Sequence, residues 1–188
     1  MATKIKERRI LGIDPGTTVM GFGVIEGDFR KAKLIELNIV SMRKVTDSME
    51  KLKTIFEETI KIIEEYLPDE MAVEAPFFGK NVQSMLKLGR AQGVVIAAAM
   101  YKNIPITEYS PRKIKQSITG KGSASKEQVA AALPFHLEMD GKHSDKLDAT
   151  DAVAVALCHM FQNRIPATEG NLSGWAAFVR NNPGRVKG

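Results

Sequence analysis

The 188-residue sequence contains a single cysteine, Cys158, and this scarcity limits the classes of protein to which it can belong. One thiol cannot form an internal disulfide framework, which fits a reducing compartment. No apolar stretch is long enough to cross a bilayer, and the mostly charged first nine residues do not match a secretory signal peptide. We therefore expect a cytoplasmic protein that does not act in a membrane.

Two common chemical signatures are also missing. There is no Walker loop, and His136, His143 and His159 do not stand at zinc-ligand spacing from Cys158. A P-loop nucleotide site and a cysteine–histidine zinc site are therefore excluded, and any metal chemistry must rely on carboxylates.

The composition favours one domain with a basic surface. At 44% hydrophobic residues the chain can bury one sizeable core, which we assign to residues 1–163. Residues 164–188 are rich in Pro, Gly, Asn and basic residues, and we expect a loosely ordered tail. The 27 Lys and Arg outnumber the 22 Asp and Glu, and this excess fits a polyanionic partner without requiring one.

The chain is organised around an apolar hairpin near its start. Residues 9–14 and 20–26 read as two strands joined by a turn at Pro15-Gly16, and the partly alternating residues 33–42 add a third antiparallel strand. A helix that begins after Asp47 and stops before Pro68 then leads to a strand at residues 71–76. Its entry from a helix suggests that this strand runs parallel to the first one.

A helix predicted at residues 82–101 is apolar around most of its circumference. One apolar face can cover the sheet, but the other needs a cover of its own, and a twofold-related copy of the chain is the simplest one. A fifth strand at residues 104–109, a short helix after Ser125 and an apolar helix from about residue 144 to Phe161 complete the pattern.

Four carboxylates stand where an isolated charge is costly. Asp14 and Glu74 end two buried strands, while Asp148 and Asp151 share one face of the last helix. Taken singly, each has an ordinary interpretation as a turn cap, a sheet-edge residue or a helix-dipole partner. If the elements converge, however, the cluster would repel itself unless hard divalent cations bind. Mg²⁺ is the usual ion beside phosphate, and two ions would suit the displacement of a phosphodiester.

Basic and aromatic residues lie between these acids in the sequence. The run Phe77-Phe78-Gly79-Lys80 suits base stacking beside a phosphate, although one Phe could instead close the core. Residues 111–126 carry no acid, and their glycines expose backbone N–H groups, which favours phosphate contact over a merely solvated face. The basic side chains of this stretch are Arg112, Lys113, Lys115, Lys121 and Lys126.

Taken together and in order, these features closely resemble the RuvC family of bacterial Holliday-junction resolvases over roughly residues 10–159. The motifs that carry the resemblance are Asp14-Pro15-Gly16, Gly21-Phe22-Gly23, Val73-Glu74, Phe77, Lys87-Leu88-Gly89, Lys121-Gly122-Ser123 and Asp148-Ala149-Thr150-Asp151-Ala152. The resemblance implies a ribonuclease-H-like α/β fold in which helices flank a five-stranded mixed sheet. It also implies a homodimer that works with a branch-migration helicase of the RuvA–RuvB type.

The resemblance further implies paired nicks in opposed strands of a four-way DNA junction during recombination and repair, dependent on Mg²⁺ or Mn²⁺ with two ions per site. By position, the metal-binding catalytic acids are Asp14, Glu74, Asp148 and Asp151. By position also, Phe77 is the aromatic that stacks on bases, and Lys115 and Lys126 are basic residues near the scissile phosphate. From the aromatic loop and the basic run themselves, we expect Lys80, Arg112 and Lys121 to contact DNA as well. His143 lies near the expected site, and we rank it below the acids.

Three other functions fit part of the pattern. The segment from Gly12 to Thr18 resembles the first phosphate loop of actin-type ATPases, but that architecture needs two such lobes and this chain is too short for both. A ribonuclease-H-like nuclease acting on RNA–DNA hybrids or other branched nucleic acid would use the same acids, and dimerisation would discriminate it. A protein that only binds junctions would not need all four carboxylates.

Overall fold

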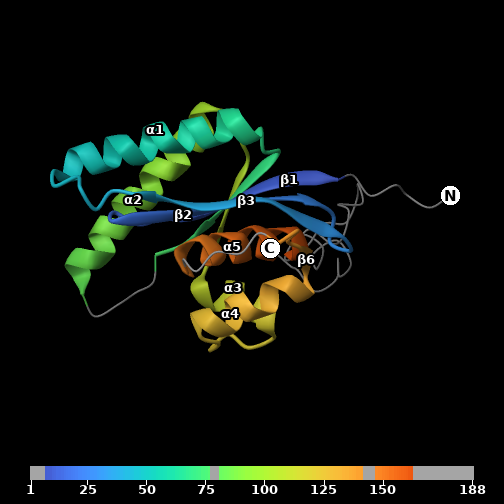
Figure 1. Ribbon diagram of the computed structural model, residues 1–188. Helices are drawn as coiled ribbons and strands as arrows, with labels where there is room; N and C mark the ends of the chain where they lie inside the picture. The colour runs from blue at the N-terminus through green and yellow to red at the C-terminus, as the bar shows by residue number, and fades with distance from the viewer. Residues whose placement is uncertain (1–6, 77–80, 142–146, 163–188) are drawn as a thin grey trace, which may run out of the picture.

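The computed structural model describes residues 7–76, 81–141 and 147–162. Figure 1 shows a mixed sheet between two layers of helices, with α1 and α2 on one face and α3, α4 and α5 on the other. The sheet order is β5-β4-β1-β2-β3-β6, so β1 and β2 occupy its centre and β4 lies beside β1. The strands are β1 (Arg8–Asp14), β2 (Val19–Gly27), β3 (Ala32–Ser41), β4 (Glu70–Glu74), β5 (Ile106–Tyr109) and β6 (Leu137–Glu138). The helices are α1 (Ser48–Tyr66), α2 (Val82–Tyr101), α3 (Pro111–Thr119), α4 (Lys126–Ala132), the 3-10 turn η1 (Leu133–Phe135) and α5 (Leu147–Gln162).

The strand pairing confirms the predicted meander and the parallel return. β1 pairs antiparallel with β2, β2 pairs antiparallel with β3, and β4 lies parallel to β1. The predicted number of five strands is wrong by one, because the short strand β6 pairs parallel with β3 at the edge of the sheet. β6 has only two residues, Leu137 and Glu138, which is too short for any alternation of apolar and polar side chains to reveal it.

Each face of the sheet carries its own apolar core. Alternate residues of β1 point to opposite faces, so Ile10 packs with the α5 side and Leu11 with the α1 and α2 side. The middle of α5 is buried almost all round, which is why residues 152–157 contain no polar side chain. This burial fixes the position of α5 against β1 and β2.

The helix starts follow the predicted caps. The Asp47 carboxylate accepts hydrogen bonds from the backbone N–H groups of Met49 and Glu50, and Ser125 forms a full capping box with Gln128 at the start of α4. α2 buries one stripe, but Leu86 and Met100 remain 54% and 66% exposed in the single chain. The second apolar face of α2 is therefore uncovered by the described part of this chain.

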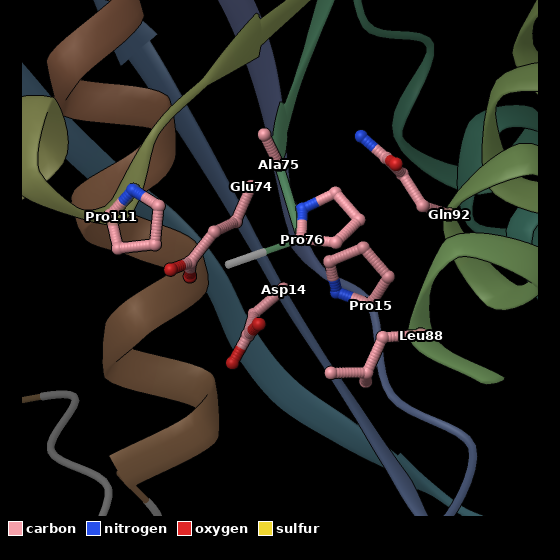
Figure 2. Close-up of a pocket in the computed structure, with 8 residues that line it drawn as sticks. All are labelled: Asp14, Pro15, Glu74, Ala75, Pro76, Leu88, Gln92 and Pro111. Carbon is pink, nitrogen blue, oxygen red and sulfur yellow. The ribbon is translucent and has the colours of Figure 1, made fainter. Parts of the chain in front are cut away.

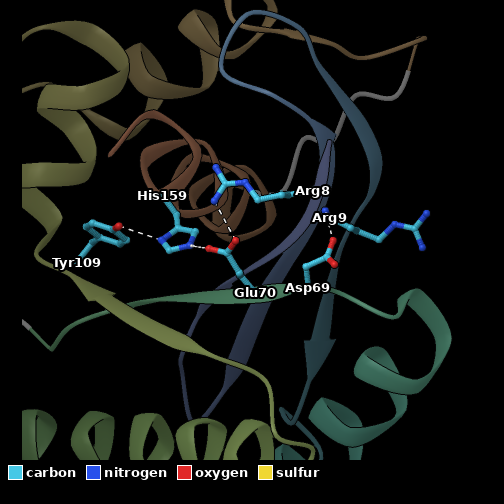
Figure 3. Close-up of polar contacts among 6 residues, drawn as sticks. All are labelled: Arg8, Arg9, Asp69, Glu70, Tyr109 and His159. Carbon is cyan, nitrogen blue, oxygen red and sulfur yellow. Dashed lines mark hydrogen bonds and ion pairs between the residues drawn. The ribbon is translucent and has the colours of Figure 1, made fainter. Parts of the chain in front are cut away.

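A network of hydrogen bonds at the start of β4 connects α5 to the sheet (Figure 3). Glu70 accepts a bond of 2.9 Å from Arg8 and lies 2.6 Å from His159 Nε2, while His159 Nδ1 lies 2.9 Å from the Tyr109 hydroxyl. Burial opposes ionisation of Glu70, but its hydrogen bonds to His159 and Arg8 hold its pKa below the ordinary value. This network lies at the opposite end of β4 from Glu74.

Within the described ranges, no helix is both long and apolar enough to span a membrane.

Candidate active site

The two strand-end acids lie side by side because their strands are parallel neighbours. Ile13 of β1 is in register with Val73 of β4, so the next residues, Asp14 and Glu74, emerge at the same edge of the sheet. Figure 2 shows both carboxylates directed away from α2 and toward the side of the pocket where α5 lies. The predicted convergence of these two acids is present in the structure.

Glycines in the central strands allow α5 to bring the other two acids to this edge. A Cβ atom added to Gly21 would lie 1.9 Å from the backbone oxygen of Asp148, and one added to Gly12 would lie 2.1 Å from that of Ala152. Only a residue without a side chain permits such close packing of helix backbone on strand. Asp148 stands in the first turn of α5 and Asp151 follows one turn later, so both face the ends of β1 and β4.

The resulting cluster has the donor chemistry of a divalent-cation site. Asp14, Asp148 and Asp151 can each offer one carboxylate oxygen, and these three atoms lie within 4.8 Å of one another. Glu74 joins the cluster because it lines the same pocket as Asp14, and its charge contributes to the raised pKa of Asp14. Carboxylate oxygens are the ligands that Mg²⁺ and Mn²⁺ prefer, so these residues fit such an ion.

Burial and mutual repulsion make the acids reluctant to ionise without a cation. Desolvation, followed by the charges of Glu74 and Asp151, raises the pKa of Asp14 to about 8. Desolvation and the charge of Asp151 raise the pKa of Glu74 to about 7, and desolvation also raises the pKa of Asp151. A bound cation would offset both effects, since it stabilises the ionised forms.

Lys126 places a positive charge directly beside the acids. Its Nζ forms an ion pair with Asp151 and lies 3.7 Å from Asp148 Oδ1. Although partial burial opposes protonation of the amine, the hydrogen bond and charge of Asp151 raise the pKa of Lys126 above its ordinary value. Lys115 lines a small hollow together with Glu74, Asp151 and Lys126. Two of the predicted DNA-binding lysines therefore lie at the acid cluster.

The other predicted residues lie farther out or outside the description. Arg112 packs against the loop after α3, where a Cβ on Gly122 would lie 2.7 Å from its Cγ, and Lys121 is exposed in that loop. No ion pair between either of them and the four acids is found in the described ranges. Phe77, Lys80 and His143 lie outside the described residues, as does the predicted tail from residue 164.

The structure adds Gln92 to the residues that the sequence analysis singled out. A pocket of about 150 Å³ beside Asp14 and Glu74 is lined by Pro15, Ala75, Pro76, Leu88, Gln92 and Pro111 (Figure 2). Gln92 is 7% exposed and donates a hydrogen bond of 2.5 Å to Glu108 Oε2. A buried amide inside an apolar helix was the available signal for this residue, because buried polar groups require partners.

Comparison with known proteins agrees with this geometry. Residues 10–159 match the family model described as crossover junction endodeoxyribonuclease RuvC. The chain is 54% identical to the crossover junction endodeoxyribonuclease RuvC of Christiangramia forsetii, over 96% of this chain and 94% of that protein. It is 53% identical to that of Bacteroides fragilis over the full length of both.

A solved structure shows the same fold. The structure of Thermus thermophilus RuvC in complex with Holliday junction substrate superposes with a TM-score of 0.76 at 31% identity, covering 84% of this chain and 95% of that one. The family match spans most of the sequence and contains all four clustered acids. The chain belongs to the RuvC family of crossover junction endodeoxyribonucleases.

Proposed function

We propose that this protein resolves Holliday junctions and that Asp14, Glu74, Asp148 and Asp151 are its catalytic acids. The observation that carries the proposal is the convergence of four carboxylates from β1, β4 and α5 at one edge of the sheet, in a chain of this family. The junction complex of the Thermus thermophilus relative supports the choice of four-way DNA as substrate. The products would be nicks with 5′-phosphate and 3′-hydroxyl ends.

The four acids would hold Mg²⁺, with Mn²⁺ as a substitute and two ions in each site. Such ions activate a water nucleophile and stabilise the charge that develops on the attacking and leaving oxygens. Asp14 and the α5 acids present the three oxygens that lie closest together, and Glu74 closes the site beside Asp14. The raised pKa values of Asp14 and Glu74 mean that ion binding releases protons from this cluster near neutral pH.

The lysines beside the acids would balance the charge of the scissile phosphate. Lys126 contacts Asp151, and Lys115 lies beside Glu74, so both ammonium groups are within reach of a phosphate at the cluster. We assign contacts with DNA backbone phosphates farther from the scissile phosphate to Arg112 and Lys121. For Phe77 and Lys80 we propose base stacking and phosphate contact beside the crossover.

A homodimer would place two such sites on one junction. The uncovered stripe of α2, which includes Val82, Leu86 and Met100, supports this assembly because an apolar helix face of this length favours a partner. Two sites related by a twofold axis match two opposed strands of a four-way junction. We also propose that a branch-migration helicase of the RuvA–RuvB type delivers the junction and that the protein acts in the bacterial cytoplasm.

Cleavage of a synthetic mobile four-way junction tests the proposal. We expect paired symmetric nicks with Mg²⁺, none with EDTA, and none in linear duplex or RNA–DNA hybrid of the same sequence. Cleavage of the hybrid alone would keep the acid cluster but assign the chain to another ribonuclease-H-like activity. Tight junction binding without any cleavage under these conditions would contradict the catalytic assignment.

A further inference from the structure

A second pocket lies on the other side of the turn that carries Asp14. It has a volume of about 270 Å³, and we call it the Lys51 pocket. It is formed by the β1–β2 turn, the start of α1 and the middle of α2, and its lining residues are Thr17, Thr18, Thr46, Ser48, Met49, Lys51, Leu52, Lys87 and Arg90. None of the DNA-contacting residues inferred above belongs to it.

The lining has an unbalanced positive charge. Three of its residues, Lys51, Lys87 and Arg90, are cationic, and none is an acid. None of the three takes part in an ion pair within the part of the chain that the structure describes. The nearby carboxylate of Asp47 is occupied, since it accepts bonds of 2.9 Å from two backbone N–H groups of α1.

The remaining lining identifies the kind of anion that fits. Thr17, Thr18, Thr46 and Ser48 add four hydroxyl groups, which together with Lys and Arg are the usual donors to phosphate oxygens in DNA complexes. No aromatic side chain lines the pocket, so it offers no stacking surface for a base. Because Thr18, Lys87 and Arg90 are exposed, a phosphate of a continuous strand can reach the pocket from solvent.

The pocket shares two walls with the acid site. In the turn, Asp14 and Pro15 line the active-site pocket, whereas Thr17 and Thr18 line the Lys51 pocket. In α2, Leu88 and Gln92 face the first pocket, while Lys87 and Arg90 line the second. The Cα atoms of Asp14 and Thr18, four residues apart, lie at most about 14 Å from each other, a length that corresponds to roughly four nucleotides at 3.4 Å of helix axis each.

We infer that the Lys51 pocket binds a backbone phosphate of the junction, within about four nucleotides of the cleaved linkage, and thereby contributes to the affinity for the junction. This inference rests on the proposed function. In this role, Lys51, Lys87 and Arg90 bind the DNA before cleavage, whereas the residues at the reacting phosphate act in the cleavage step. Loss of the pocket should therefore weaken junction binding and leave the rate of cleavage at saturating protein unchanged.

The test compares two double variants of equal net charge. Lys51→Gln/Lys87→Gln removes two pocket cations, and Lys53→Gln/Lys61→Gln removes two lysines of α1 that do not line the pocket. Junction affinity is measured by fluorescence anisotropy in Ca²⁺ at several salt concentrations. Each phosphate that is no longer neutralised lowers the slope of log affinity against log salt by about 0.9, so loss of the one seated phosphate should lower the slope by roughly 1 and raise the Kd about tenfold at moderate salt for the pocket variant alone.

A neutral linkage in the DNA locates the phosphate. Methylphosphonates are placed one at a time on either side of the linkage that the wild type cleaves. One position within about four nucleotides should weaken binding of the wild type severalfold and leave the pocket variant unaffected. Single-turnover cleavage at saturating protein should be the same for the wild type and both variants.

Several outcomes would overturn the inference. Equal salt slopes for the two double variants would show that the pocket cations make no phosphate contact. Uniform effects of every methylphosphonate on both proteins would show that no single phosphate is seated there, and an altered sedimentation coefficient of the pocket variant would assign the surface to a subunit contact. If the wild type itself does not cleave junctions, the proposed function fails, whereas cleavage with equal slopes leaves that function intact and removes only this inference.

Discussion

Replacing Asp14 with Asn should stabilise the protein in the absence of divalent cations while abolishing cleavage. The pKa of Asp14 is raised to about 8 from 3.8, so the folded state binds a proton that the unfolded chain has released at pH 7. An acid with a raised folded-state pKa lowers stability as pH rises from about 4 to 8, and at pH 7 the cost is about 4 kcal/mol as an upper figure. Asn carries no charge to desolvate, so Asp14→Asn should recover a few kcal/mol of this cost, or about 5–10 °C in Tm.

Thermal unfolding in EDTA at pH 8 and pH 5, followed by a titration with Mg²⁺, measures this effect. We expect the advantage of Asp14→Asn to be large at pH 8 and small at pH 5. The wild type should gain stability on adding Mg²⁺ and the variant should gain little, since one ligand is missing. Junction affinity should be retained or improved, because negative charge near phosphate is removed. A variant that is less stable than the wild type in EDTA, or that gains as much from Mg²⁺, would refute the reasoning.

Three further predictions address other parts of the fold. Gly21→Ala should destabilise the protein to urea by roughly 1–3 kcal/mol and slow cleavage, because its Cβ would overlap the backbone of Asp148. Glu70 has a lowered pKa, so its contribution to stability is present above about pH 4.5 and is lost as pH falls through its folded-state pKa, and Glu70→Gln should flatten the acid limb of the stability profile. Lys126→Ala should slow single-turnover cleavage at saturating protein and shift its pH profile to higher pH, because the charge of Lys126 lowers the pKa of Asp14 and Glu74, and Lys126→Arg should restore part of both.

Local signals in the sequence were sufficient for most of the fold. The apolar strands that end in Asp14 and Glu74 could be recognised from composition and turn residues, and their adjacency followed from the parallel return through α1. The three-residue spacing of Asp148 and Asp151 placed both acids on one helix face. The sixth strand could not be predicted. Its two residues pair with β3 only because the tertiary fold places the segment after α4 beside that edge of the sheet.

The tertiary details of the site were beyond the sequence pattern. Gly12 and Gly21 lie within the two predicted strands of the hairpin, and their role in admitting α5 follows only from the packing of helix on strand. The ion pair of Lys126 with Asp151 joins α4 to α5, and no local spacing encodes it. The Lys51 pocket is likewise assembled from three separate segments that share no sequence motif.

The most direct test of the account is to locate the cation. Crystals of the protein grown with Mn²⁺ would be examined by anomalous diffraction at the manganese edge. The account predicts a peak within about 2.5 Å of carboxylate oxygens of Asp14, Asp148 and Asp151, absent from Asp14→Asn crystals. A protein that cleaves junctions with Mn²⁺ but shows no peak at these acids, or shows it at other residues, would contradict the assignment of the active site.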